Sequence, residues 1–297
     1  MKYVSVIGAG TMGNGIAHVF AQKGFTVSLV DSQPQQLEKA LRTIAQNLER
    51  QAAKGLISEE GKKTTLDNIA TFKEIAAGVQ NADLVVEAAT ENSDIKLAIF
   101  KELDQHAPAG CILASNTSSI SITKIAAATR RPESVIGLHF MNPVPVMKLI
   151  EIINGYATDP AVTQQMVELA GRLGKTPCVA NDYPGFIANR ILMPMINEAI
   201  YSLYEGVAGV LEIDNIMKLG MAHPMGPLQL ADFIGLDVCL SILRVLHDGF
   251  GNPKYAPCPL LVNMVMAGHL GIKSGEGFYQ YTQGSKELVL SKRFTRQ

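Results

Sequence analysis

The sequence predicts an α/β fold with a doubly wound, mostly parallel sheet, followed by an all-helical C-terminal domain. Up to residue 183, short apolar stretches alternate with helical stretches of about 10–15 residues, which is the pattern of βαβ units. Beyond residue 183 the hydrophobic period changes and helical stretches follow one another. We therefore expect a domain of residues 1–183 and a second domain of residues 184–297, divided at Tyr183-Pro184.

The strands of the first domain are predicted from short runs of aliphatic and β-branched residues. These runs are 3–7, 26–30, 84–87, 111–115, 135–139, 149–153 and 178–180. The main helices between them are expected over 34–54, 94–105 and 160–173. In the second domain, helices are expected over 186–205, 212–219, 227–246 and 259–267. The basic tail from Gly284, with Lys286, Lys292, Arg293 and Arg296, is expected to form a frayed, solvated end.

Composition limits the classes of function. The 297 residues carry 26 basic and 27 acidic side chains, and this balance argues against nucleic acid as the main partner, because phosphate binding requires a basic surplus. No apolar run approaches the ~18–20 residues that span a bilayer, so no membrane partner is expected. Four cysteines without a Cys-x-x-Cys pair, and an apolar strand directly after Met1-Lys2, indicate a cytoplasmic protein without a zinc site.

The first strand is followed by Gly8-Ala-Gly10-Thr-Met-Gly13, a Gly-x-Gly-x-x-Gly loop that opens a helix. In a Rossmann-type dinucleotide site, these glycines make the tight turn, admit the pyrophosphate and let helix and strand pack closely. Asp31 ends the next strand, where a carboxylate accepts hydrogen bonds from the adenosine ribose and repels a 2′-phosphate. We therefore expect NAD to be bound by Gly8, Gly10, Thr11, Met12, Gly13 and Asp31. An ordinary glycine turn and a flavin enzyme are the alternatives.

His139 and Glu151 are the first catalytic candidates. His139 ends an apolar strand, and ligands of open α/β sheets bind at the carboxyl ends of strands. Glu151 lies between aliphatic neighbours, where a carboxylate is costly to bury unless it is paired. Two short strands joined by one loop could bring Glu151 beside His139 and favour the protonated imidazole. Alternatively, Glu151 faces solvent and His139 is a core residue.

Polar side chains at two further positions suit a substrate site. The run Ser115-Asn-Thr-Ser-Ser119 follows a buried strand, and its hydroxyl and amide groups can hold a polar substrate atom and the nicotinamide amide. A serine-rich turn that caps the next helix explains this run equally well. Asn189, on an otherwise apolar helix after the boundary, either reaches the cleft between the domains or hydrogen-bonds within their interface.

Seven motifs occur in order along the chain. They are Gly8-Ala-Gly-Thr-Met-Gly13, Ala114-Ser-Asn-Thr-Ser-Ser119, His139-Phe-Met-Asn-Pro143, Met147-Lys-Leu-Ile-Glu151, Pro184-Gly-Phe-Ile-Ala-Asn-Arg190, His223-Pro-Met-Gly-Pro227 and Lys273-Ser-Gly-Glu-Gly-Phe-Tyr279. Together they resemble the 3-hydroxyacyl-CoA dehydrogenase family, and most closely its short, single-function members. The resemblance extends from residue 1 to about residue 281 and leaves only the tail.

The resemblance implies an NAD domain and a helical domain that supplies much of a homodimer interface. It implies that an (S)-3-hydroxyacyl-CoA, 3-hydroxybutyryl-CoA in particular, is interconverted with a 3-oxoacyl-CoA. His139 looks like the family's catalytic base and Glu151 like its partner. The other implied roles are Ser118 and Asn189 at the substrate oxygen, Asn116, Glu91, Lys96, Asn142 and Lys273 at the cofactor, and Arg50 and Lys54 at the coenzyme A phosphates.

Two features depart from the family pattern, and two other functions stay open. Glu276 stands where relatives often have lysine, and the tail continues beyond the usual end. One alternative function is a dehydrogenase of a free hydroxy acid with the same architecture, similar to L-gulonate dehydrogenase and lambda-crystallin. The other is a non-catalytic NAD-binding protein.

Overall fold

The chain divides into two units, Met1–Tyr183 and Pro184–Gln297, each with its own buried apolar core. This division comes from a computed structural model that describes residues 1–282, 284 and 287–295. Within those residues, no helix has both the length and the apolar character needed to cross a membrane.

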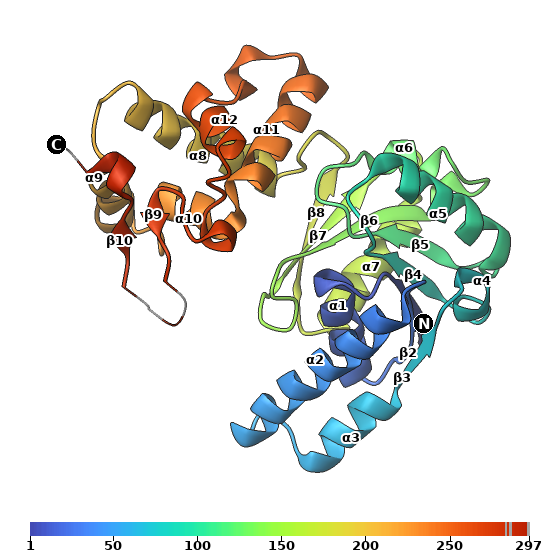
Figure 1. Cartoon of the computed structure of the whole chain (residues 1–297). Coiled ribbons are helices and arrows are strands. Elements are labelled where there is room, and N and C mark those ends of the chain that lie inside the picture. Colours follow the sequence, from blue (N-terminus) through green and yellow to red (C-terminus); the bar gives the residue numbers. More distant parts are fainter. Residues whose placement is uncertain (283, 285–286, 296–297) are drawn as a thin grey trace. The chain divides into compact units, whose positions relative to one another are not determined.

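The first unit is built on a twisted sheet, in which the described residues form eight strands (Figure 1). The strand order is β3-β2-β1-β4-β5-β6-β7-β8. β7 runs antiparallel to β6, whereas the other neighbours in this sheet pair in parallel. The predicted doubly wound, mostly parallel sheet is therefore confirmed. The strands are β1 (Tyr3–Ile7), β2 (Thr26–Val30), β3 (Ile69–Phe72), β4 (Leu84–Glu87), β5 (Ile112–Ser115), β6 (Val135–Phe140), β7 (Leu149–Asn154) and β8 (Thr176–Asn181).

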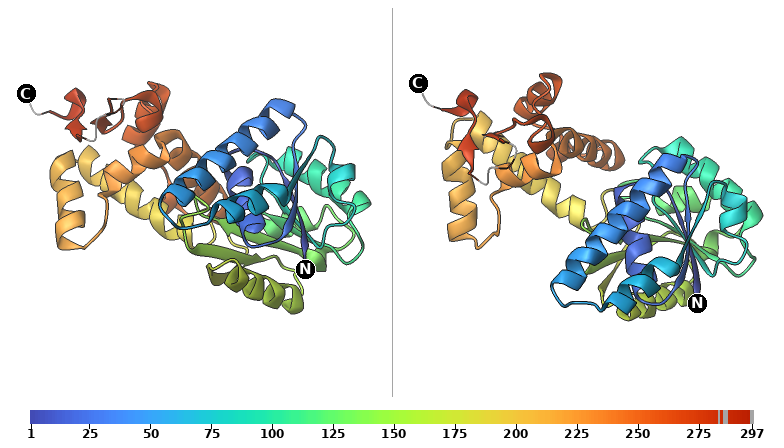
Figure 2. Two further views of the ribbon diagram at one scale, coloured as in Figure 1. Left: turned by 90° about the horizontal axis from the view of Figure 1, so that it is seen from below. Right: turned by 60° about the horizontal axis from the view of Figure 1, so that its bottom comes forward.

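Helices cover both faces of this sheet (Figure 2), because the inner strands carry buried apolar side chains on both sides. One face packs against α1 (Thr11–Gln22), α2 (Pro34–Ala53) and α7 (Pro160–Arg172), with α3 (Glu59–Asp67) beside α1 and α2. The other helices of this unit are α4 (Ile75–Gly78), α5 (Ser93–His106) and α6 (Ile122–Ala126). β3 and α3 were not predicted. For β3 the reason is that it has only four residues, none of them fully buried.

The second unit is helical, as predicted. Its helices are α8 (Ala188–Tyr204), α9 (Val210–Asn215), which continues as a π-helix over Ile216–Gly220, α10 (Pro227–Ile234), α11 (Leu236–Phe250) and α12 (Pro259–Met266). The prediction of one helix over 227–246 is wrong, because the chain breaks at Gly235. Gly235 adopts a φ of +104°, a backbone conformation that side chains with a Cβ rarely adopt, so the position favours glycine.

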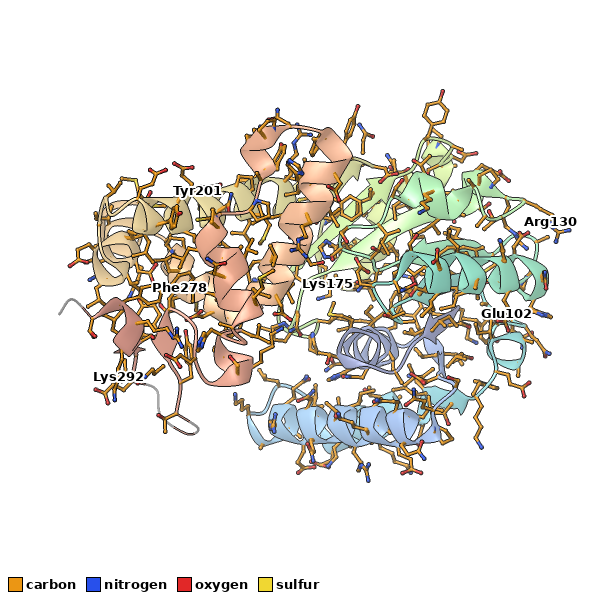
Figure 3. All side chains as sticks on the ribbon, turned by 45° about the horizontal axis from the view of Figure 1, so that its top comes forward. Glu102, Arg130, Lys175, Tyr201, Phe278 and Lys292 are labelled. Carbon is orange, nitrogen blue, oxygen red and sulfur yellow. The ribbon has the colours of Figure 1, made fainter. Side chains whose placement is uncertain are left out.

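The prediction of a frayed C-terminal end is also wrong for the described part of the tail. β10 (Val289–Leu290) pairs with β9 (Tyr279–Gln280), which adds a short antiparallel pair to the helical unit. Ser291 is fully buried and donates a hydrogen bond to Glu276 at 2.8 Å, while the Phe294 ring packs against Phe278, labelled in Figure 3. Apolar burial therefore holds the tail in place. Lys286 and Arg296 lie outside the described residues.

Two buried carboxylates organise the second unit. Asp214 accepts hydrogen bonds from the first backbone N–H groups of α10 and from the Tyr279 hydroxyl at 2.7 Å. Asp232 is fully buried and accepts the backbone N–H groups of Phe278 and Tyr279 at 3.0 and 2.9 Å. Burial raises the pKa of Asp232 to about 6, despite these hydrogen bonds. The C-terminal segment is thus fixed to α10 through one acidic side chain.

We expect the natural chain to lose stability relative to an Asp232→Asn variant as the pH rises from about 4 to about 6. The unfolded chain loses this proton near pH 3.8, whereas the folded chain keeps it up to a pKa of about 6. The folded state holds more protons between these values, so its unfolding free energy falls by up to about 1.4 kcal/mol per pH unit. Urea unfolding followed by circular dichroism measures the difference. An equal pH dependence in both proteins contradicts the expectation.

Candidate active site

Five residues of the first unit mark the carboxyl ends of its parallel strands. Gly8 follows β1, Asp31 follows β2, Glu87 ends β4 and Ser115 ends β5. His139 is the next-to-last residue of β6. Because these strands run in the same direction, their ends meet at one edge, where ligands of open α/β sheets bind.

The glycine loop has the geometry that a dinucleotide requires. Gly8 adopts a φ of +97°, and a Cβ at Gly13 would lie 1.7 Å from Gly8 O, so both positions require glycine for packing. A Cβ at Gly10, by contrast, would have no heavy atom of the described chain within 4 Å. Gly10 caps α1, whose first turn contains Thr11, Met12 and Gly13. The residues therefore fit a pyrophosphate, which would meet open space and the unpaired N–H groups of a helix N-terminus.

Asp31 is held in place by backbone donors. Its two carboxylate oxygens accept hydrogen bonds from Ala9 N and Gln33 N, each at 2.9 Å. The first of these bonds ties the carboxylate to the glycine loop, and Gly8 N in turn donates to Val30 O at 2.7 Å. The end of β2 and the loop after β1 thus form one rigid element.

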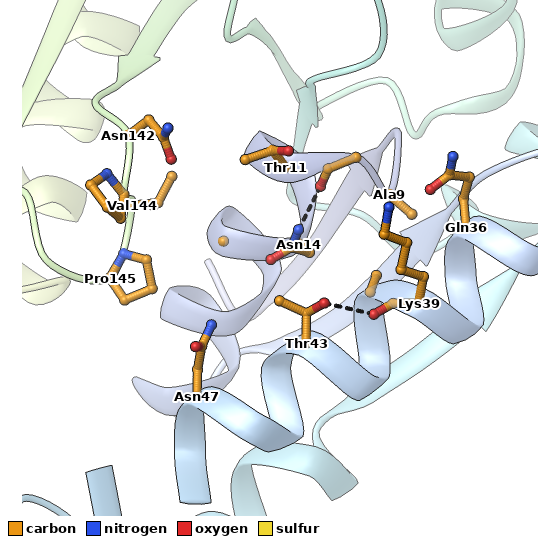
Figure 4. Close-up of a pocket in the computed structure, with 14 residues that line it drawn as sticks. Ala9, Thr11, Asn14, Gln36, Lys39, Thr43, Asn47, Asn142, Val144 and Pro145 are labelled. Atoms are coloured by element: carbon orange, nitrogen blue, oxygen red, sulfur yellow. Dashed lines mark hydrogen bonds between the residues drawn. The ribbon is translucent and has the colours of Figure 1, made fainter. Parts of the chain in front are cut away.

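A pocket of about 410 Å³ opens beside this loop (Figure 4). α1 contributes Thr11 and Asn14 to its lining, and the loop after β6 contributes Asn142. The third side consists of polar residues of α2 that we did not predict, namely Lys39, Thr43 and Asn47. Their spacing of four residues places them on one helix face, and this regular polar face is the signal that could have identified them.

His139 and Glu151 face each other directly across β6 and β7. The two residues are register partners in this antiparallel pair, and His139 Nδ1 lies 2.7 Å from Glu151 Oε2. The side chain of His139 is 12% exposed and that of Glu151 is 4% exposed. β8 covers the other edge of β7, so Glu151 lies on an inner strand and does not face solvent. Glu151 therefore holds the imidazole through Nδ1, and the His139 side chain remains partly accessible.

Glu91 holds the segment after β5. Its Oε1 accepts the Thr117 hydroxyl at 2.7 Å, Ser118 N at 2.8 Å and Ser119 N at 3.0 Å, as well as both serine hydroxyls. Burial opposes the ionisation of Glu91, but these hydrogen bonds and the Lys96 ammonium outweigh it and hold its pKa below the usual range. Ser118 is thus fixed by an ionised carboxylate.

Glu87 is a site residue that the sequence analysis missed. It is fully buried at the end of β4, and both of its oxygens lie 2.8 Å from Lys96 Nζ. Its backbone carbonyl accepts Asn116 N at 2.7 Å, and Asn116 Oδ1 accepts Phe140 N at 2.9 Å, which joins β4 to the end of β6. The available signal was an acidic residue at the end of an apolar strand, the position that also identified Asp31.

The remaining candidates lie elsewhere. Arg50 and Lys54 are exposed at the C-terminal end of α2, where Arg50 donates to Asn47 Oδ1 at 3.4 Å. Asn189 lies buried in the first turn of α8 in the second unit. Lys273, in the same unit, forms an ion pair with Asp237. Lys96, expected at the cofactor, directs its ammonium toward Glu87.

This fold, with a glycine loop, a strand-end carboxylate and a polar crevice, defines an NAD-dependent dehydrogenase. Residues 3–183 match the model of the 3-hydroxyacyl-CoA dehydrogenase NAD binding domain, and residues 185–281 match that of the C-terminal domain. The chain belongs to the 3-hydroxyacyl-CoA dehydrogenase family.

Individual relatives cover nearly the whole chain. It is 53% identical to a probable 3-hydroxybutyryl-CoA dehydrogenase of Bacillus subtilis over 95% of this chain and 98% of that protein. It is 44% identical to the human mitochondrial hydroxyacyl-coenzyme A dehydrogenase, over 95% and 91% of the two chains. A crystal structure of an (S)-3-hydroxybutyryl-CoA dehydrogenase from Ralstonia eutropha superposes with a TM-score of 0.93 at 46% identity, over 95% of this chain and 100% of that one.

We expect a Gly10→Ala variant to fold normally but to bind NADH at least about tenfold more weakly, a loss of about 1.4 kcal/mol. The added methyl group meets no atom of the described chain, yet it occupies the space that the pyrophosphate needs. Quenching of NADH fluorescence measures the affinity, and thermal unfolding checks the fold. Gly171→Ala, which also adds a methyl group in open space but lies on α7, is the control. Equal NADH affinity in both variants contradicts this placement of the cofactor.

Proposed function

We propose that this dehydrogenase interconverts (S)-3-hydroxyacyl-CoA and 3-oxoacyl-CoA, with 3-hydroxybutyryl-CoA as its main substrate and a histidine–glutamate pair as its acid and base. The observation that carries the proposal is the 2.7 Å contact between His139 Nδ1 and Glu151 Oε2 at the carboxyl edge of the sheet. The names of the bacterial relatives support the choice of the four-carbon substrate.

In the oxidative direction, His139 removes the proton from the 3-hydroxyl group of the substrate. In this proposal its Nδ1–H donates to Glu151, so Nε2 is the nitrogen that takes the proton. The imidazolium that results is stabilised by the Glu151 carboxylate, which is nearly buried and therefore weakly screened. NAD, held by the glycine loop and Asp31, would supply the acceptor for the hydride that leaves the substrate carbon. In the reverse direction, protonated His139 returns the proton to the 3-oxo group.

The substrate oxygen is oriented by Ser118 and Asn189 in this proposal. Glu91 accepts the backbone N–H and the hydroxyl of Ser118, which fixes the position of this residue. Glu91, Lys96, Asn116, Asn142 and Lys273 are assigned to the nicotinamide half of the cofactor, and the glycine loop with Asp31 to the adenosine half. Asp31 also favours NAD over a cofactor with a 2′-phosphate, because the two negative charges repel each other.

Coenzyme A is assigned to the C-terminal end of α2. Arg50 and Lys54 are exposed there, so their charges can meet phosphates in solvent without a cost of desolvation. Two exposed cations at one place can attract the phosphates of coenzyme A without an overall excess of positive charge. A chain with 26 basic and 27 acidic side chains can therefore still bind this ligand.

We also propose that the chain forms a homodimer through its helical unit. Large apolar side chains are exposed on this unit, where they would otherwise contact water. The most exposed include Val207, Ile216, Leu219, Met221 and Phe233, at 57–83%. An apolar pocket of about 350 Å³ lies among α8, α9 and the start of α10.

We propose in addition that the protein is cytoplasmic, because its four cysteines are free thiols.

We expect His139→Ala to lower kcat for the reduction of acetoacetyl-CoA by at least about 100-fold while the affinity for NADH stays unchanged. The loss of NADH absorbance measures the rate, with Glu151→Gln as a comparison that keeps the imidazole but removes its charged partner. Glu151→Gln should also shift the pH profile. Near-normal turnover by His139→Ala would exclude His139 as the base. Turnover of L-gulonate without turnover of acetoacetyl-CoA by the natural chain would overturn the substrate class.

We expect a double variant, Ile216→Asp with Leu219→Asp, to be monomeric at concentrations where the natural chain is a dimer. Both side chains are exposed in the single chain, so the changes cost little folding free energy but place charges in an apolar interface. Light scattering coupled to size-exclusion chromatography measures the mass. Tyr156→Asp, at a residue of the first unit that is 94% exposed, is the control. A dimer in the double variant excludes this interface.

A further inference from the structure

We propose that Glu87 is a positioning residue of the dehydrogenase, which sets the geometry of Ser118 and of the glycine loop without contacting substrate or cofactor. The proposal rests on the function proposed above, because it concerns the same site. It starts from a buried ion pair, since Glu87 is fully buried and Lys96 is 2% exposed. Such a pair contributes little net stability compared with apolar side chains of similar volume, so stability alone does not account for it.

Glu87 connects three strands at the edge where the site lies. It is the last residue of β4 and is in register with Ile7, the residue before the glycine loop, and with Ser115, the last residue of β5. Its carboxylate accepts Ala89 N and the Ser115 hydroxyl, each at 2.8 Å. Oε1 therefore holds the backbone after β4 and Oε2 holds the end of β5, while Lys96 contacts both oxygens.

The contact with Ala89 reaches the cofactor side. A Cβ at Gly8 would lie 2.7 Å from both Ala88 O and Ala89 Cα, so the backbone after β4 packs directly against the glycine loop. Because Glu87 holds Ala89 N, it also fixes the backbone segment that packs against the turn at Gly8. A shift of this backbone would move the loop in which the pyrophosphate is expected.

The contact with Ser115 reaches the substrate side through a chain of hydrogen bonds. Ser115 Oγ accepts Thr117 N at 3.2 Å, and the Thr117 hydroxyl donates to Glu91 at 2.7 Å. Glu91 in turn accepts Ser118 N at 2.8 Å. Four consecutive contacts thus lead from the buried carboxylate of Glu87 to the residue assigned to the substrate oxygen.

The charge of Glu87 also controls Lys96. The ammonium lies 2.8 Å from both oxygens of Glu87, but 3.7 Å from Glu91 Oε2. If a substitution removes the charge of Glu87, Glu91 is the remaining carboxylate beside this cation. The Lys96 side chain is buried whereas that of Glu91 is 41% exposed, so water screens the attraction between them only in part. Glu91 would then move toward Lys96 and away from Ser118. Glu87 therefore keeps the two acidic groups in separate roles.

The test is a Glu87→Gln variant, which keeps the shape of the side chain and removes its charge. We expect kcat for acetoacetyl-CoA to fall at least about tenfold while each chain still binds one NADH. The deuterium isotope effect on kcat with NADH labelled at the transferred position should rise, because a misplaced substrate slows hydride transfer. Glu87→Asp, which keeps the charge, should recover part of the rate. A structural role alone would lower NADH stoichiometry in parallel with the rate and leave the isotope effect unchanged.

Asp104→Asn is the matched control. Asp104, on α5, is like Glu87 a nearly buried carboxylate with ionic partners, which are Arg130 and Arg131. It should leave kcat per bound NADH within about twofold of the natural value. A natural rate and isotope effect in Glu87→Gln, or equal losses in Glu87→Gln and Asp104→Asn, would overturn the positioning role. If the natural chain itself does not reduce acetoacetyl-CoA, the proposed function fails instead, so the two failures are distinguishable.

Discussion

Pairing of buried carboxylates determines which segments of this chain are rigid. A carboxylate that has lost its water must find other donors, and removal of one partner of a buried pair costs about 3–5 kcal/mol. Glu87, Glu151 and Asp232 are each at most 3% exposed. Each fixes one neighbouring part of the chain: the 115–119 segment, the His139 side chain near the end of β6 and the C-terminal segment. In the first unit these segments carry the proposed chemistry.

The reversal of strand direction at β7 creates the histidine–glutamate pair. A parallel neighbour would need a crossover of a dozen or more residues, whereas an antiparallel neighbour can follow after a short loop and face its partner directly. The loop itself is braced by Lys175, labelled in Figure 3, whose buried ammonium donates to Val144 O and Met147 O at 2.7 and 2.6 Å. Burial lowers the pKa of Lys175. The position of Glu151 beside His139 thus follows from the antiparallel pairing of β6 with β7, and Lys175 supports the loop that joins these strands.

The tail gives this chain a feature beyond the part that matches its family. The family model ends at residue 281, and Glu276 was the departure from the family pattern noted in the sequence. The structure joins these two observations, because Glu276 accepts the hydroxyl of Ser291 at 2.8 Å and lies 3.8 Å from the Arg293 guanidinium. A lysine at this position would repel Arg293. The negative charge of Glu276 therefore attracts the basic tail, whereas a lysine would not.

The sequence by itself determined the features that depend on neighbouring residues. The apolar runs located the long strands, the glycine spacing identified the dinucleotide loop, and the change of period marked the start of the helical region. Only the tertiary structure decided the partners of Glu87 and Glu276, the pocket face of α2 and the helix break at Gly235. Local patterns record the preferences of single segments, whereas a buried charge or a positive φ depends on atoms that distant segments supply. The tail illustrates the reason: its charged residues predict solvation, but the burial of Ser291 and the packing of Phe294 against Phe278 keep it folded.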